Sequence, residues 1–250
     1  TGNLGLSPIT GKLTLEVPLV KEESSMIIGG RTTYSDWLLK RTKNSAIKHS
    51  NASFYDITGK INYKLNDKNY INLSFYNSSD WFNLANDTTF KYHNLASTLN
   101  WKSNVNDKTN LSTSIVYSNY FYDVSRNNAS TTDFTQTYNL NFIQIKSDLL
   151  YIPGFKHNIH AGIESGLYRL DPGTIKPNGN MSLIKELSVN DEQAIESALY
   201  IGDEFRYSPR ISIYGGLRYS FYTMLGPAKI YQYEQEVPKV FPSTVVDSES

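Results

Sequence analysis

The charged side chains that could bind or react with a ligand recur at alternate positions along several segments of the chain. In residues 53–65, Asp56, Lys60 and Lys64 alternate with apolar residues. Alternate residues of a β-strand point to the same side, so this spacing predicts a polar strand face that carries the charges. The charged candidates for lining this face are Asp56, Lys60, Lys64, Glu164, Glu196, Glu204, Arg206 and Arg218. They could form a path for a solute, but hydration and cross-strand pairing are the simpler interpretation.

The histidines and the sequence motifs do not favour metal binding or catalysis. His157 and His160 are three residues apart, which places them on opposite faces of a strand, where they cannot bind one metal ion together. His49 and His93 have no acidic residue or histidine at ligand spacing. The sequence contains no GxSxG, Walker or HExxH motif. We therefore predict no metal site, no cofactor and no enzymatic activity.

Aromatic residues form a second group of candidates, in segments predicted to connect strands. Exposed rings on such connections could stack on a sugar, cap a cofactor or contact a lipoprotein, and they could equally belong to an aromatic girdle at a membrane interface. The pair Tyr231 and Tyr233 is the better functional candidate because it lies well beyond a strand. The ligand or partner candidates in this group are Trp81, Phe82, Tyr122, Tyr231 and Tyr233.

Ten segments with a period of two residues are predicted as strands. Many have ten or more residues, whereas strands of soluble proteins usually have about five or six. A tilted strand needs roughly ten residues to cross a bilayer, so the lengths favour a transmembrane barrel. The predicted strands are residues 11–20, 25–36, 53–65, 69–78, 90–102, 109–122, 134–150, 157–170, 194–207 and 210–225.

The connections between the predicted strands alternate strictly between short and long. Tight turns are expected after residues 20, 65, 102, 152 and 207, with long connections in between. Short turns on one rim and long loops on the other are typical of outer-membrane barrels, whose short turns face the periplasm. The fold class is therefore predicted as all-β, an antiparallel transmembrane barrel section with its apolar face toward lipid. The alternative is a soluble β-protein whose apolar face packs a core, which leaves the strand length unexplained.

Three positions interrupt this pattern. In residues 134–150 the apolar set changes phase between Phe142 and Ile143, which predicts a β-bulge at that point. Asp203 and Arg169 fall on the apolar face by strict alternation. Both lie near the end of a predicted strand, where a charge on the lipid side costs only about 0 to 1 kcal/mol.

Composition excludes several other classes of protein. The 24 basic residues balance the 24 acidic residues, and no block of like charges suggests nucleic-acid binding. The chain has no cysteine and no apolar run long enough for a transmembrane helix. It begins without an initiator methionine or a signal peptide, so a processed chain or a piece of a longer protein is expected.

Three stretches resemble the barrel of TonB-dependent outer-membrane receptors, in particular the group with a carboxypeptidase-like regulatory domain. They are ITGKLTLEVPLVKEESSMIIGGRTTYSDWLLK at residues 9–40, FYDITGKINYKLNDKNYINLSFYNSSDWF at 54–82, and EQAIESALYIGDEF with ISIYGGLRYSFYTMLGP within 192–227. The resemblance covers nearly the whole chain. It rests on barrel strands, so it indicates a family and leaves the substrate open.

The resemblance implies a plugged barrel of about 22 strands, of which residues 1–250 would be a middle segment of about ten. The plug and the TonB box of that family do not occur in this sequence. The implied function is part of the energy-coupled import of a bulky nutrient, such as an iron chelate, oligosaccharide, peptide or cofactor. The implied partners are outer-membrane lipid, the protein's own plug, TonB and a surface lipoprotein, and the implied location is the Gram-negative outer membrane.

Two alternatives to a transport role remain open. The barrel could act as a scaffold subunit of an outer-membrane assembly or secretion complex, with its loops docking lipoproteins. An outer-membrane protease is another ten-stranded barrel, but it needs acidic residues and histidine at the extracellular rim. His160, the histidine on the polar face, is predicted near the opposite rim.

Overall fold

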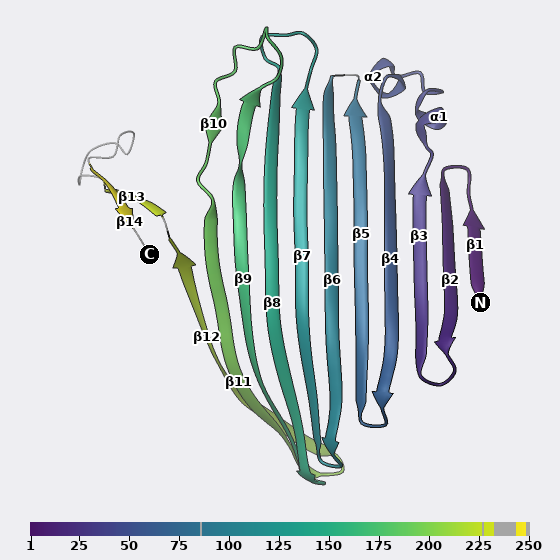
Figure 1. Cartoon of the computed structure of the whole chain (residues 1–250), viewed down its shortest axis with the longest axis vertical. Coiled ribbons are helices and arrows are strands. Elements are labelled where there is room, and N and C mark those ends of the chain that lie inside the picture. Colours follow the sequence, from purple (N-terminus) through teal and green to yellow (C-terminus); the bar gives the residue numbers. More distant parts are fainter. Residues whose placement is uncertain (86, 227, 233–243, 249–250) are drawn as a thin grey trace.

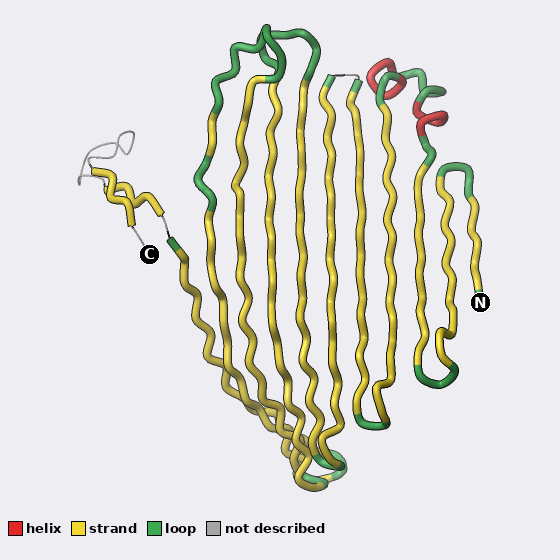
Figure 2. Tube along the Cα trace, in the orientation of Figure 1, coloured by secondary structure: helices red, strands yellow, loops and turns green. Residues whose placement is uncertain are grey.

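One antiparallel sheet of long strands makes up most of the chain (Figures 1 and 2). The computed structural model describes residues 1–85, 87–226, 228–232 and 244–248. The strands pair in the order β1 to β9, then β11 and β12, and β10 pairs with β9. Their bounds are β1 (Gly2–Leu6), β2 (Thr10–Val20), β3 (Ser24–Thr33), β4 (Asn51–Asn66), β5 (Asn69–Leu84), β6 (Thr88–Asn106), β7 (Thr109–Arg126), β8 (Phe134–Gly154), β9 (His157–Pro177), β10 (Leu187–Ser188), β11 (Glu192–Ser208) and β12 (Ile211–Leu225). A separate two-stranded sheet pairs β13 (Ala228–Gln232) with β14 (Thr244–Ser248).

All ten predicted strands are present in the sheet, and β1 and β10 are additional strands. The six strands β4 to β9 have 16 to 21 residues each. At about 3.3 Å per residue, an 18-residue strand is about 60 Å long. Because the hydrocarbon core of a bilayer is about 30 Å thick, these strands are long enough to cross it at a tilt and continue beyond it.

Large apolar side chains share one face of the sheet and form no buried core. Among the described residues, the buried apolar ones are Ala194 and Ala198. The strand register aligns exposed or half-buried apolar residues in rows that run across the sheet. One such row contains Val17, Met26, Ile61, Leu73, Leu99, Ile115 and Ile145. We call the face that carries this row the apolar face and the opposite one the polar face.

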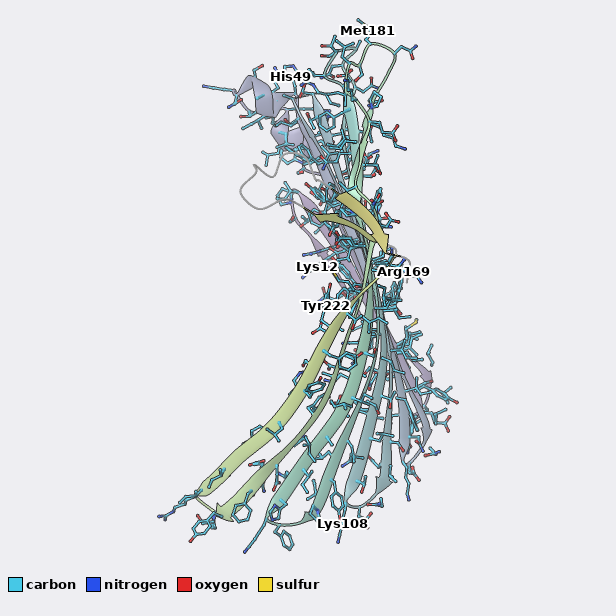
Figure 3. All side chains as sticks on the ribbon, turned by 90° about the vertical axis from the view of Figure 1, so that its left-hand side faces the viewer. Lys12, His49, Lys108, Arg169, Met181 and Tyr222 are labelled. Atoms are coloured by element: carbon cyan, nitrogen blue, oxygen red, sulfur yellow. The ribbon has the colours of Figure 1, made fainter. Side chains whose placement is uncertain are left out.

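The exposure of these side chains favours the membrane interpretation over the soluble one. Ile57, Leu73, Leu99 and Ile213 are 38 to 60% exposed, whereas the core of a soluble protein would bury them. The prediction of an apolar outer face is therefore confirmed. No second layer of described residues covers this face (Figure 3).

The predicted β-bulge between Phe142 and Ile143 is wrong. Phe142 pairs with Ser118 and Ile143 pairs with Tyr117, with no shift of register between them. The shifts between β8 and β9 lie near the two strand ends, at residues 137–139 and 151–154. The strand therefore keeps its regular alternation, and the apolar residues above this point face the polar side of the sheet.

The two rims of the sheet differ in the length of their connections. The lower rim of Figure 1 carries only short turns, at residues 21–23, 67–68, 107–108, 155–156 and 209–210. The upper rim carries the longer connections, with two exceptions: residues 7–9 join β1 to β2, and β5 continues to Leu84 while β6 begins at Thr88. The strict alternation predicted from the sequence is therefore wrong at the β5–β6 hairpin, because both strands extend through the segment expected to be a loop.

Local hydrogen bonds order two of the upper connections. The β3–β4 connection contains α1 (Asp36–Leu39) and α2 (Ser45–Lys48), and Asn44 caps α2 by accepting the N–H of Ala46 at 3.0 Å. Neither of these helices is long or apolar enough to span a membrane, and no other described segment is such a helix.

Asp133 orders the connection between β7 and β8. Its side chain is almost completely buried, and its Oδ2 accepts the backbone N–H groups of Asn128 and Ser130 at 2.8 and 2.9 Å. The hydroxyl of Ser182 donates to the backbone carbonyl of Asp133 at 2.5 Å, and the N–H of Leu183 donates to the carbonyl of Thr131 at 2.8 Å. These bonds join the β7–β8 connection to the segment that follows β9.

Candidate lumenal binding surface

The polar face carries all eight charged residues predicted to share it. Each occupies a register position on the side opposite the apolar rows. Figure 3 shows this division edge-on, with Lys12 and Tyr222 on one side of the sheet and Arg169 on the other. In a closed barrel the polar side would face the enclosed space, which makes it the candidate surface for binding a solute.

Two of the predicted residues, Glu164 and Arg218, meet in a polar cluster that spans β8 to β12. They form an ion pair between β9 and β12. The Tyr200 hydroxyl donates to Asp148, and the Arg218 guanidinium lies 5.4 Å from the centre of the Tyr200 ring. Lys146 completes the cluster, with its Nζ 3.5 Å from Asp148 Oδ2 and 5.7 Å from the same ring centre. The charges in this cluster are therefore paired across strands.

A glycine provides the space for the aromatic ring of the polar cluster. Tyr200 lies over Gly162 of the neighbouring strand, where a Cβ atom would collide with the ring. A side chain at residue 162 would displace the hydroxyl that bonds Asp148. Aromatic residues packed over strand glycines are a common device in curved sheets.

Lys146, Asp148 and Tyr200 were not among the site residues predicted from the sequence. Lys146 and Asp148 alternate with Ile145 and Leu149 on β8, so the same period-two signal places them on the polar face. The register between β8, β9, β11 and β12 brings the residues of the cluster together, although they lie up to 72 positions apart in the chain.

The other predicted charges have separate partners. Asp56 on β4 forms an ion pair with Arg31 on β3. Lys64 lies 2.6 Å from Asp67 in the β4–β5 turn, and its hydrogen bond lowers the pKa of the Asp67 carboxyl. Lys60 is exposed on the same face. These residues lie toward the β3–β5 side of the sheet and do not join the polar cluster.

Three further predicted residues lie on β11. Glu204 accepts a hydrogen bond from Asn158 at 3.0 Å and lies 3.7 Å from Arg206. Glu196 accepts a hydrogen bond from the Tyr168 hydroxyl at 3.3 Å. Glu196 has no ion-pair partner among the described residues, which distinguishes it from Glu164 and Glu204.

Trp81, Phe82 and Tyr122 were candidates at extracellular loops but lie inside strands, because β5 and β7 continue beyond residues 78 and 122, where the predicted strands end. Trp81 and Phe82 belong to β5 and point to opposite faces, and Phe82 stacks with Phe90 at 6.1 Å between ring centres. Tyr122 belongs to β7 and stacks with Tyr138 at 5.2 Å on the polar face. The placement of Trp81 and Phe82 in a loop is wrong, and Tyr122 does not border a loop, because the upper parts of both strands extend further than the sequence indicated. The backbone of Tyr231 lies in β13, and Tyr233 lies outside the described residues.

A hollow of about 320 Å³ opens on the polar face between β8, β9, β11 and β12. It is lined by Tyr138, Leu140, Tyr168, Leu170, Glu192, Gln193, Ala194, Glu196, Tyr222 and Met224. A larger hollow of about 910 Å³ has walls made mainly of side chains on the apolar face, such as Leu149, Ile163 and Ile201. That hollow belongs to the surface expected to face lipid, so the smaller one is the better candidate for a solute.

The two charged residues expected on the apolar face are located there. The Asp203 carboxylate lies 2.6 Å from Nδ1 of His157, near the lower rim. This pair was not predicted from the sequence. Arg169 lies in the row of Asn141 and Gln193, above the apolar rows. Within the described part of the chain, no three His, Cys, Asp or Glu side chains gather at metal-binding distance.

Comparison with known proteins gives matches in structure alone. No family model and no curated protein sequence matches the chain. The copper transporter OprC aligns over 92% of this chain with a TM-score of 0.68 and 9% identity. The ferric preacinetobactin receptor BauA of Acinetobacter baumannii aligns over 90% with a TM-score of 0.67 and 10% identity. The ferric-catecholate import receptor Fiu of E. coli K12 aligns over 96% with a TM-score of 0.65 and 11% identity. The chain spans 37, 40 and 48% of the lengths of these three proteins.

Long antiparallel strands with one apolar and one polar face define a section of a transmembrane β-barrel. More specifically, the chain has the fold of the barrel of TonB-dependent outer-membrane receptors. The resemblance seen in the sequence is confirmed at the level of the fold. The sheet is open between β1 and β12, as expected for part of a larger barrel.

Proposed function

We propose that residues 1–250 form one segment of the barrel wall of a TonB-dependent receptor in the Gram-negative outer membrane. The observation that carries the proposal is the opposite character of the two faces. Apolar residues form continuous exposed rows on one face, and paired charges occupy the other. An outer-membrane barrel needs this arrangement, because lipid contacts one side of each strand and water contacts the other.

In this proposal the chain contributes a wall and does not catalyse a reaction. A plug elsewhere in the protein would close the barrel, and TonB would supply the energy to move the plug. The wall contacts outer-membrane lipid, and a surface lipoprotein could dock on the upper connections. The cargo would be a bulky nutrient such as an iron chelate, oligosaccharide, peptide or cofactor. The structural neighbours are a copper transporter and receptors for ferric compounds, which supports import as the general role.

Deletion of the TonB box from the full-length protein tests this function. Cells that depend on the protein for a nutrient should lose uptake, while the amount of folded protein in the outer membrane stays the same. A loss of uptake together with a loss of folded protein would show a folding defect, and restoring the box must then restore both. Uptake that is unchanged by the deletion would contradict energy-coupled import and favour a scaffold role.

A further inference from the structure

The hollow on the polar face arises where β8 turns apolar side chains toward the expected lumen. Tyr138, Leu140 and Phe142 occupy alternate positions on this face. Because the strand has no bulge at Phe142, these residues cannot be directed to the lipid side. Apolar side chains on a water-facing surface are costly unless something covers them, and such patches usually mark binding sites.

The neighbouring strands extend the patch and leave a space in it. The register places Phe142, Tyr168, Ala194 and Met224 in one row across β8, β9, β11 and β12. Ala194 is the smallest of the four and lies between Tyr168 and Met224. Its short side chain leaves the floor of the hollow open between larger neighbours. A volume of about 320 Å³ accommodates a ligand body of about the size of a substituted aromatic ring.

Carboxylates flank this floor on the same strand. Glu192 and Glu196 lie two residues before and two residues after Ala194, so both are on the polar face and both line the hollow. The Tyr168 hydroxyl donates to Glu196 at 3.3 Å, which orients the carboxylate without neutralising its charge.

The nearby cations are held by other groups. Arg218 pairs with Glu164, and Lys146 lies beside Asp148 and Tyr200, below the hollow. Arg169 lies on the opposite face of the sheet (Figure 3). Among the described residues, the lining of the hollow therefore contains two carboxylates and no basic side chain.

We propose that this hollow binds an organic cation that carries an apolar body, with an ammonium or guanidinium group directed at Glu192 and Glu196. The apolar body lies against Leu140, Tyr168 and Met224. Tyrosine rings add to the attraction, because a cation is stabilised over an aromatic face. The inference rests on the proposed function, since it requires the polar face to line an aqueous lumen.

Calorimetry on the full-length protein in detergent tests the site with three probes of nearly equal shape. Tyramine carries an ammonium group, 2-(4-hydroxyphenyl)ethanol is neutral and 4-hydroxyphenylacetate is an anion. Tyramine should bind about tenfold or more tightly than the neutral probe, as expected for a charge-assisted hydrogen bond, and the anion should bind more weakly still. Equal binding of the three probes, or no binding of tyramine, would overturn the proposal.

Three variants test whether tyramine binds at Glu192 and Glu196. Glu196→Gln and Glu192→Gln keep the size of the side chain and should each weaken tyramine binding about fivefold to tenfold, without changing the affinity for the neutral probe. Glu204→Gln is the matched control, because Glu204 lies on the same strand and face but about 26 Å from Glu196 by strand rise. It should leave tyramine binding unchanged.

The outcomes separate failure of the site from failure of the proposed function. If uptake depends on the TonB box but neither glutamate variant affects tyramine binding, the site is wrong and the receptor role stands. If the full-length protein does not bind tyramine and Glu196→Gln destabilises its fold, a cation from another part of the protein occupies the hollow. The proposal of a solute site is then wrong as well.

Discussion

The contrast between the two faces of β6 gives the sharpest test of the membrane assignment. Leu99 lies near the middle of the apolar positions of this strand, between Leu95 and Trp101, and its side chain is 42% exposed. In a water-soluble sheet, arginine at such an exposed position would change the free energy of unfolding by less than about 0.5 kcal/mol. In a bilayer, arginine on the lipid face near the midplane costs about 2 to 4 kcal/mol. Leu99→Arg therefore distinguishes the two environments by several kcal/mol.

Thr98→Arg is the matched control, because Thr98 is adjacent to Leu99 and points to the polar face. Its substitution should change the free energy of unfolding by less than about 0.5 kcal/mol. The assay is reversible unfolding by denaturant of the full-length protein in phospholipid vesicles, followed by tryptophan fluorescence. A free energy of unfolding for Leu99→Arg within about 0.5 kcal/mol of the wild-type value would refute the lipid-facing assignment. An equal loss of unfolding free energy in Leu99→Arg and Thr98→Arg would refute it as well.

Two further predictions concern packing on the polar face and at the upper rim. Gly162→Ala should displace the Tyr200 ring from its place over residue 162 and cost about 1 to 2 kcal/mol through loss of the hydrogen bond to Asp148. In a Tyr200→Ala background the same substitution should cost almost nothing, and an equal cost in both backgrounds would contradict the packing argument. Asp133→Ala should remove two hydrogen bonds to backbone N–H groups and open residues 127–133 and 178–186 to limited proteolysis, with the strands still protected. Asp133→Asn keeps a side-chain acceptor and should have a smaller effect, and unchanged cleavage in both variants would show that Asp133 does not hold these segments.

The sequence alone determined which side chains share a face. In residues 53–65 the alternation of Tyr55, Ile57 and Ile61 with Asp56 and Lys60 specifies two faces of opposite character, because the side chains of a strand alternate whatever it pairs with. The same rule located the ten main strands, and it placed Asp203 and Arg169 on the apolar face. Hairpin turns at the lower rim are also local features, and all five are present, although the turns expected after residues 102 and 152 lie at 107–108 and 155–156.

The sequence did not determine how far the strands extend above the expected membrane or what the side chains contact across strands. Trp81 and Phe82 have the polar neighbours typical of loops, but pairing with β4 and β6 keeps them in β5. Pairing between distant segments supplies backbone hydrogen bonds that no local pattern reveals. For the same reason, the extra strands β1 and β10 were not predicted.

Only the tertiary structure decided which face the residues on either side of the phase change in β8 point to. It also decided which residues make up the polar cluster. A bulge and an inward-facing apolar patch produce the same sequence pattern, and only the register at Phe142 and Ile143 distinguishes them. The pairs Glu164 with Arg218 and His157 with Asp203 join residues 54 and 46 positions apart. Contacts of this kind follow from strand order and register, which are set by hydrogen bonding along the entire sheet.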